Sequence, residues 1–278
     1  SIPTIRLDDP NEARTVQTLR KCCLEHGFFY LGGHGIEDLF PQVLSQSAKL
    51  FALPLHEKKR LCDSQMSRGF TQMEEETLDP KNQPNRGDTK EGFYIGRDVP
   101  IDHHEYNPTK LKGPNVWPTR DNCSMTDCDT FQKVMKDYFT RASKVGLEVV
   151  RLLALAIGLQ DKHALDSSFT ENFASIRLLH YAPVTSKPEN GLFACGAHSD
   201  YGMITLLMTD ENPGLQIQTQ TGEWMDVPPS SIDDGLFIVN LGDMMERWTN
   251  GLFRSTVHRV LTSGDKDRYS VPFFLRTK

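Results

Sequence analysis

A series of short apolar segments separated by turn residues fills the C-terminal half of this sequence, and it limits the possible folds more than any other feature. Short runs rich in β-branched and aromatic residues, bounded by Gly, Pro, Asn and Asp, are typical of β-strands. Turn signals include Asn190-Gly191, Asn212-Pro213-Gly214 and Asp234-Gly235. Seven or eight such strands favour a sandwich or jelly roll with helices packed outside it. The expected strands are 175–181, 204–208, 215–218, 225–227, 236–241, 258–261 and 269–274.

The N-terminal half has helical periodicity instead. Asp9-Pro10-Asn11-Glu12 resembles a capping box and predicts the start of a helix, and Gly27 is suited to end that helix. A short strand is expected over 28–31 and a second helix over 39–51. Apolar residues from Phe131 to Ile157 recur at helical spacing and predict one long helix. We therefore expect an N-terminal helical or mixed region over 1–125, packed on a core unit over 126–278, with the two forming one compact body.

Between these helices, residues 64–117 are rich in Pro, Asn, Asp and Gly and predict a long irregular segment with a strand near 93–95. Long irregular segments in compact domains often act as lids or binding loops. Phe93, Tyr94 and Trp117 are therefore predicted to line the mouth of a substrate pocket.

Charge and composition exclude several classes of partner. The chain carries 31 Lys and Arg against 37 Asp and Glu, a formal net charge of −6, and it has no long basic run. It therefore lacks the electrostatic footprint of a nucleic-acid-binding protein. No apolar run approaches the ~20 residues that cross a bilayer. The six cysteines, two of them adjacent, do not form a disulfide pattern, so a reduced, cytoplasmic protein is expected. We also expect a monomer.

The segment Gly196-Ala197-His198-Ser199-Asp200 carries the strongest chemical signal. On an extended backbone, residues i and i+2 face the same side, so His198 and Asp200 can point at one ion. A His-x-Asp pair alone is also common at polar strand edges. His258, in another predicted strand, is the best candidate for a third ligand. Two histidines and one carboxylate on one face of a metal are typical of non-haem Fe(II) oxygenases.

A second pair follows ten residues after His258. Arg268 and Ser270 alternate on a predicted strand and therefore share a face. A guanidinium group offers planar bidentate donors to a carboxylate, and a neighbouring hydroxyl adds one more bond. An Arg-x-Ser pair alone is weak evidence for a binding site. Its distance from His258, however, suits a site for one carboxylate of a dicarboxylate whose other end chelates the metal.

These motifs make the sequence resemble the 2-oxoglutarate- and iron(II)-dependent dioxygenases, in the plant-type branch that contains isopenicillin N synthase, anthocyanidin synthase and the gibberellin oxidases. The resemblance runs along nearly the whole chain. Its motifs, in family order, are Ile2-Pro3-Thr4-Ile5, His26-Gly27-Phe28-Phe29, Gly33-His34-Gly35-Ile36, Arg177 to Tyr181, His198-x-Asp200, Gly214-Leu215-Gln216, Trp224, Asn240-Leu241-Gly242-Asp243, Trp248-Thr249-Asn250-Gly251, Ser255, His258-Arg259-Val260 and Arg268-x-Ser270.

The resemblance implies a fold that is mainly β with α, with a double-stranded β-helix (jelly-roll) core flanked by helices. It implies Fe(II) held by His198, Asp200 and His258, and 2-oxoglutarate held by Arg268, Ser270 and Tyr181. The implied reaction uses O2 to hydroxylate a small-molecule metabolite, or to desaturate or cyclise it, and releases succinate and CO2. Ascorbate is an expected aid in vitro.

The sequence also departs from the family pattern. The family often has Asn-Tyr-Tyr-Pro where this chain has Leu179-His180-Tyr181-Ala182, so the Asn contact to the cosubstrate is missing here. Two alternatives stay open at this point. One is an iron oxidase of the same fold that does not use 2-oxoglutarate, and the other is a metal- or ligand-binding module without turnover. The sequence does not identify the substrate.

Overall fold

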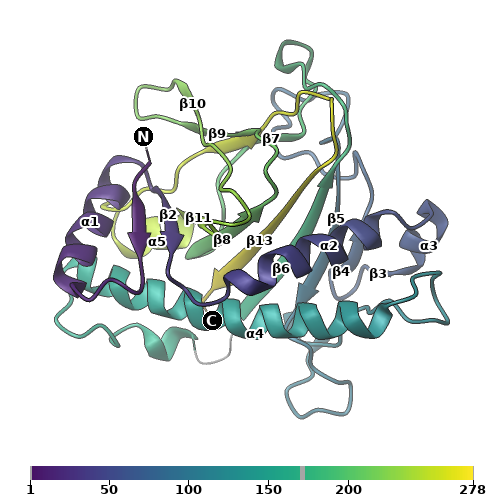
Figure 1. The fold of residues 1–278 in the computed structure, drawn as a ribbon, viewed down its shortest axis with the longest axis horizontal. Helices are drawn as coiled ribbons and strands as arrows, with labels where there is room; N and C mark the ends of the chain where they lie inside the picture. Colours follow the sequence, from purple (N-terminus) through teal and green to yellow (C-terminus); the bar gives the residue numbers. More distant parts are fainter. Residues whose placement is uncertain (1, 170–172, 278) are drawn as a thin grey trace.

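The computed structural model describes residues 2–169 and 173–277, in which two β-sheets face each other (Figure 1). The larger sheet has nine strands in the order β1-β2-β11-β8-β13-β6-β5-β4-β3, and the smaller has four in the order β10-β9-β12-β7. The strands are β1 (Thr4–Arg6), β2 (Phe28–Gly32), β3 (Cys62–Asp63), β4 (Arg68–Thr71), β5 (Lys90–Gly96), β6 (Phe173–Tyr181), β7 (Cys195–His198), β8 (Ile204–Thr209), β9 (Leu215–Gln218), β10 (Trp224–Asp226), β11 (Phe237–Leu241), β12 (His258–Val260) and β13 (Arg268–Arg276).

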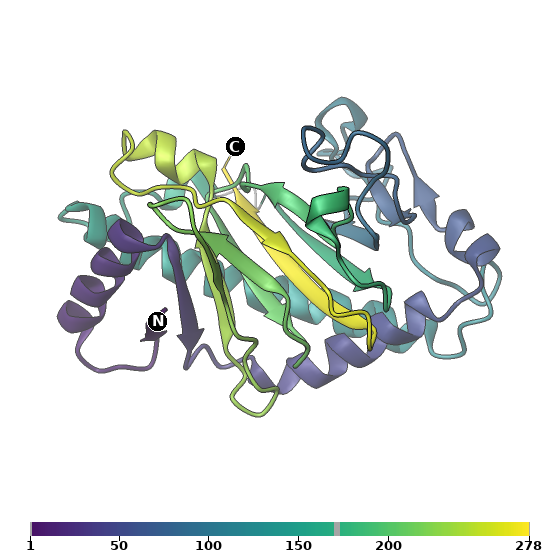
Figure 2. The same ribbon diagram turned by 90° about the horizontal axis from the view of Figure 1, so that it is seen from above.

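The helices lie around this pair of sheets. In Figure 1, α4 runs across the larger sheet on the side away from β9 and β10, and the view from above in Figure 2 shows the strands crossing over it. Within the described ranges, no helix combines the length and apolar character that a bilayer-spanning segment needs. The helices are α1 (Glu12–Glu25), α2 (Phe40–Phe51), α3 (Leu55–Arg60), α4 (Cys128–Ile157) and α5 (Asp243–Trp248), with short 3-10 turns between them.

The long helix α4 forms because its apolar residues recur on one stripe, as its sequence predicts. Phe131, Tyr138, Ala142 and Val149 are almost fully buried. The helix ends at Gly158, whose φ of 106° is in the left-handed region that glycine adopts without strain. α4 therefore stabilises the larger sheet by covering apolar side chains that would otherwise face water.

The larger sheet has two chemically different faces, because successive side chains of a strand point to opposite sides. We call the side that faces the smaller sheet the inner face, and the side covered by α2 and α4 the outer face. On β13, Phe273 and Leu275 belong to the large apolar core of the outer face. Arg268 and Ser270 are buried on the inner face, in the space between the sheets.

The jelly-roll core flanked by helices is confirmed, and so are the seven expected strands of the C-terminal half. The helices expected near 12–26, over 39–51 and up to 157 are present as α1, α2 and α4. The segment 64–117 is less irregular than expected, since it contributes β4 as well as β5 to the sheet. The region over 1–125 supplies strands β1 to β5, so it extends the same sheet as well as packing on it.

Candidate metal and cosubstrate site

Three ligand-type side chains converge between the two sheets. His258 begins β12 and pairs directly with His198 at the end of β7, and Asp200 follows β7 by two residues. Asp200 Oδ1 lies 3.9 Å from His198 Nε2 and 4.0 Å from His258 Nε2. Two atoms that each bind one ion at about 2.1 Å lie at most ~4.2 Å apart. The three side chains that the sequence singled out are therefore placed to share one cation.

Backbone carbonyls fix the orientation of both imidazoles. His198 Nδ1 is 2.8 Å from the carbonyl oxygen of Gly196, and His258 Nδ1 is 3.1 Å from that of Thr256. A carbonyl oxygen can only accept, so each Nδ1 carries the proton and donates it. Each Nε2 then presents a lone pair towards Asp200, which is the tautomer that a metal ligand needs.

The carboxylate of Asp200 is fixed in the same way. Its Oδ2 accepts hydrogen bonds from the hydroxyl of Thr205 at 2.6 Å and the amide of Asn240 at 2.8 Å. Its Oδ1 is left facing the two histidines. No local pattern in the sequence marks Thr205, and Asn240 stands out in the sequence only as part of the family motif Asn240-Leu241-Gly242-Asp243. Only their position opposite Asp200 in the folded chain reveals that they orient a ligand.

Burial and charge set suitable protonation states. Burial lowers the pKa of His258 to about 4, so the imidazole is neutral near pH 7. Burial alone would raise the pKa of Asp200, but its neighbours His258 and His198 and its two hydrogen bonds outweigh burial and lower it. Two imidazole nitrogens and one carboxylate form a donor set that suits Fe(II), with one side of the ion open to further ligands.

A buried guanidinium group faces the same cavity. Arg268 is 2% exposed, its Nη1 has no hydrogen-bond partner among the residues that the structure describes, and its guanidinium carbon lies 4.9 Å from the centre of the Tyr181 ring. Arg268 and Tyr181 are paired across β13 and β6, and Ser270 is buried two residues further along β13. A buried donor without a partner is costly. The unpartnered Nη1 of Arg268 is suited to bind a carboxylate, which can accept two parallel hydrogen bonds from a guanidinium group.

All six of these predicted residues line one cavity of about 70 Å³ between the sheets. Lys90 and Arg177 also line it, each paired with a carboxylate from the segment before β5. His180 directly precedes Tyr181 in β6, so its side chain points to the outer face. There it forms hydrogen bonds with Glu91 and Asp267, which indicates a structural role.

Two of the three residues predicted to line the substrate mouth lie on the other side of the larger sheet from this cavity. Phe93 is fully buried on the outer face, where its ring meets Phe131 of α4. Trp117 also packs against Phe131 and lines a separate groove beside α4. Tyr94 is on the inner face, and the centre of its ring lies 4.5 Å from the guanidinium carbon of Arg177. Its contact with substrate stays a prediction. Phe93 and Tyr94 are neighbours in β5, so they cannot face the same side.

Comparison with known proteins agrees with this geometry. Residues 2–120 match the family model for the N-terminal part of non-haem dioxygenases in morphine synthesis, and residues 173–277 match the 2OG-Fe(II) oxygenase superfamily. The 2-oxoglutarate-dependent dioxygenase traH of Penicillium crustosum is 36% identical over 98% of this chain and 83% of the relative. Kihadalactone A synthase LFS of Citrus sinensis is 34% identical over 99% and 80%.

A solved structure is similar over the whole chain. A full-length protein from Neurospora crassa, crystallised in complex with alpha-KG and thymine, has a TM-score of 0.84 and 29% sequence identity, and the match covers 100% of this chain and 86% of that one. Several of the similar curated relatives are fungal, so the similarity is not confined to the plant-type branch. Their identity and coverage, together with the converging donor set, show that this chain belongs to the 2OG-Fe(II) oxygenase superfamily and is a 2-oxoglutarate-dependent dioxygenase.

Proposed function

We propose that His198, Asp200 and His258 hold the Fe(II) of this dioxygenase, and that Arg268 binds the distal carboxylate of 2-oxoglutarate with Ser270 and Tyr181 beside it. The observation that carries the proposal is the convergence, within the described residues, of three metal-ligand atoms with an unpaired buried guanidinium nitrogen in one cavity. When bound, iron and 2-oxoglutarate supply the oxidising chemistry with O2, releasing succinate and CO2 while a small-molecule substrate is oxidised.

The chain's own residues then have separate tasks. The carbonyls of Gly196 and Thr256 keep the imidazole protons away from the ion. Thr205 and Asn240 hold one oxygen of Asp200, so that the other is free to bind. Arg268 orients the cosubstrate from the far end, since a fork of two donors fixes a carboxylate in direction as well as position.

Specialised metabolites are the proposed substrate class. Relatives include clavatol oxidase claD of Penicillium crustosum, 36% identical over 96% of this chain, and the kihadalactone A synthase. Hydroxylation is the proposed outcome, with desaturation or oxidative cyclisation as alternatives. We also propose that the enzyme is a monomer that works in the cytoplasm. Its six free cysteines, four of them buried, support a reducing compartment.

The test is an anaerobic titration of the Fe(II)-loaded enzyme with 2-oxoglutarate, followed by the visible metal-to-ligand charge-transfer band. We expect a saturable band in the wild type and none in Asp200→Ala. Succinate release with a panel of metabolites then identifies the substrate and separates this enzyme from an oxidase that does not need 2-oxoglutarate. A wild-type band that survives unchanged in Asp200→Ala would contradict the assigned ligand role.

A further inference from the structure

A buried ion pair connects a residue that lines the cavity, Lys90, to the strand that carries His198. Lys90, on the inner face of β5, contacts Asp88, and their side chains are 2% and 0% exposed. Replacing a buried ion pair by apolar residues is often neutral or stabilising, so such a pair is weak evidence for a role in stability. The contacts of Asp88 indicate what this pair does instead.

The Asp88 carboxylate connects the segment before β5 to β7. Its Oδ1 accepts from the backbone N–H of Gly196 at 2.8 Å and from the side-chain amide of Gln83 at 3.0 Å. Its Oδ2 accepts from Lys90. The carbonyl of the same Gly196 accepts the Nδ1 proton of His198. One residue of β7 is therefore held on one side by Asp88 and orients a metal ligand on the other.

The segment that carries Gln83, the amide donor to Asp88, also approaches Gly196 closely. A Cβ at that position would lie 2.3 Å from Gln83 Oε1 and 2.9 Å from the backbone nitrogen of Asp79. Only glycine lets the segment around Asp79 and Gln83 reach β7. Thr89 makes a further contact from the same segment: its backbone N–H donates a hydrogen bond to the carbonyl of Phe193, two residues before β7, at 3.0 Å.

We infer that Asp88 is a positioning residue for the iron site: with Lys90 as its counter-charge, it fixes the Gly196 peptide and thereby the imidazole of His198. The inference rests on the proposed ligand role of His198. Outer-shell partners of metal ligands typically change metal affinity or activity by about 10- to 100-fold when they are removed. We expect a loss of that size in Fe(II) affinity for Asp88→Ala.

The neighbouring residue provides a matched control. Glu91 follows Lys90 in β5 but points to the outer face, where it is 4% exposed and accepts from Lys58 at 2.7 Å and His180 at 2.8 Å. Glu91→Gln removes a buried charge from the same strand without touching β7. It is expected to lower the melting temperature and to leave Fe(II) affinity within about threefold of wild type.

The experiment measures Fe(II) binding to the apo-protein anaerobically, together with the visible spectrum of the Co(II)-substituted protein. Asp88→Ala should lose affinity and change the Co(II) ligand-field bands, which report coordination geometry. Asp88→Asn combined with Lys90→Met should restore most of both, because an amide oxygen can still accept from Gly196 and no charge of the pair is left unpaired. The double variant Asp88→Ala with Lys90→Met leaves no unpaired charge of this pair and keeps the test valid should the single variant not fold.

Four outcomes separate the possibilities. Weakened binding and altered bands in Asp88→Ala or in Asp88→Ala with Lys90→Met, with Asp88→Asn plus Lys90→Met and Glu91→Gln near wild type, support the inference. Wild-type binding and bands in Asp88→Ala with Lys90→Met overturn it. An equal loss in Glu91→Gln also overturns it, since the effect is then one of general stability. Full iron retention in His198→Ala contradicts the proposed ligand itself and identifies a failure of the proposed function.

Discussion

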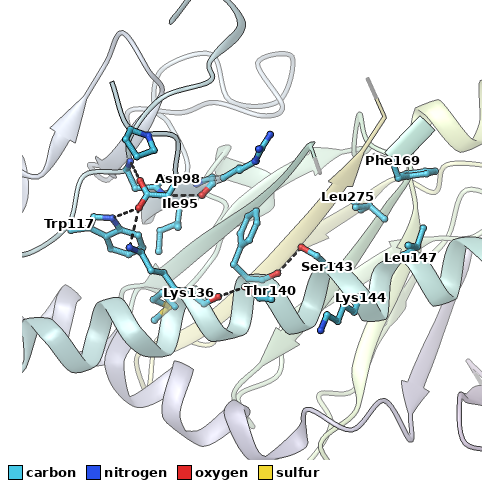
Figure 3. Close-up of a pocket in the computed structure, with 16 residues that line it drawn as sticks. Ile95, Asp98, Trp117, Lys136, Thr140, Ser143, Lys144, Leu147, Phe169 and Leu275 are labelled. Carbon is cyan, nitrogen blue, oxygen red and sulfur yellow. Dashed lines mark hydrogen bonds and ion pairs between the residues drawn. The ribbon is translucent and has the colours of Figure 1, made fainter. Parts of the chain in front are cut away.

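The inner and outer faces of the larger sheet each border a cavity, and the two cavities differ in an instructive way. The groove on the outer face, along α4, has a volume of about 710 Å³, ten times the 70 Å³ of the cavity between the sheets (Figure 3). Trp117, Lys136, Phe139 and Leu147 line it. By size alone, the outer groove is the better binding site.

The polar groups give the opposite ranking. In the outer groove, Lys136 and Trp117 both contact Asp98, and the hydroxyls of Thr140 and Ser143 bond to carbonyls of their own helix (Figure 3). These groups already have partners. The inner cavity holds three convergent metal-ligand atoms and a guanidinium nitrogen that has none in the part of the chain that the structure describes. Unsatisfied buried groups identify a site better than volume does, because the protein retains them at a cost.

Removing a metal ligand from the inner cavity should have the largest effect. His258→Ala is expected to abolish product formation and iron retention, while the far-UV circular dichroism stays near that of wild type. The measurement is iron stoichiometry after anaerobic loading and desalting, with succinate release alongside. His56→Ala, an exposed histidine on α3, is the matched control and should retain iron. Full activity with one bound iron in His258→Ala would rule out its role.

Removing the cosubstrate clamp should have the next largest effect. Taking away one member of a buried charge pair costs about 3–5 kcal/mol. At ~1.4 kcal/mol per tenfold, Arg268→Ala should lose about 10²- to 10³-fold in 2-oxoglutarate affinity. Lysine should rescue only in part, since a point charge cannot reproduce the fork. The anaerobic charge-transfer titration measures this, and iron content should stay near wild type. An unchanged dissociation constant would disprove the assignment.

A substitution on the outer face should change stability rather than binding. Phe273 of β13 is fully buried, and its ring lies 5.8 Å from that of Phe139. Phe273→Ala should lower the free energy of unfolding by about 3–5 kcal/mol, through lost burial and the cavity that remains. Urea denaturation checks this. The folded variant should bind 2-oxoglutarate as wild type does, and a large loss of affinity would show that the two faces are not independent.

The outer face should also carry a pH dependence. Burial alone would lower the pKa of His180, but hydrogen bonds to Glu91 and Asp267 outweigh burial and raise it above the ordinary 6.5. The folded state therefore favours the charged imidazole. Its contribution to stability is fully present below pH 6.5 and is lost as the pH rises through the higher pKa of the folded state. Melting temperatures in an alkaline series should fall less in His180→Gln; an unchanged slope would count against this.

The smallest effect is expected in the outer groove itself. Lys144 is exposed at its edge, so Lys144→Ala should change the free energy of unfolding by no more than about 0.5 kcal/mol. Its kcat/KM for the identified substrate should stay within about twofold of wild type. A larger loss of activity would mean that the groove takes part in the reaction, and the contrast between the two cavities would then fail.

The residues that sequence reasoning found and missed differ in a physical way. His198 and Asp200 were predictable because strand alternation makes residues i and i+2 share a face. The same rule could not say which of Phe93 and Tyr94 faces inward, since the apolar pattern of β5 fits both faces. α3 and α5, at six residues each, are too short to show a helical period.

The buried charges were invisible for another reason. Asp88 and Lys90 lie in a stretch rich in polar residues, where charged side chains are usually solvated. Asn240 and Thr205 likewise become meaningful only when β11 and β8 bring them to Asp200. Local patterns identify groups that act on the ion directly. They do not identify partners that reach it through contacts distant in sequence.

The alternation of Lys90 and Glu91 along β5 also limits how this protein can evolve. Insertion or deletion of one residue at the start of β5 would turn every following side chain to the opposite face. Such a shift would place Glu91 beside the cavity in place of Lys90 and remove the carboxylate partner of Lys58 from the outer face. Relatives should therefore tolerate substitutions in β5 but keep its length, while length variation collects in the loops around it.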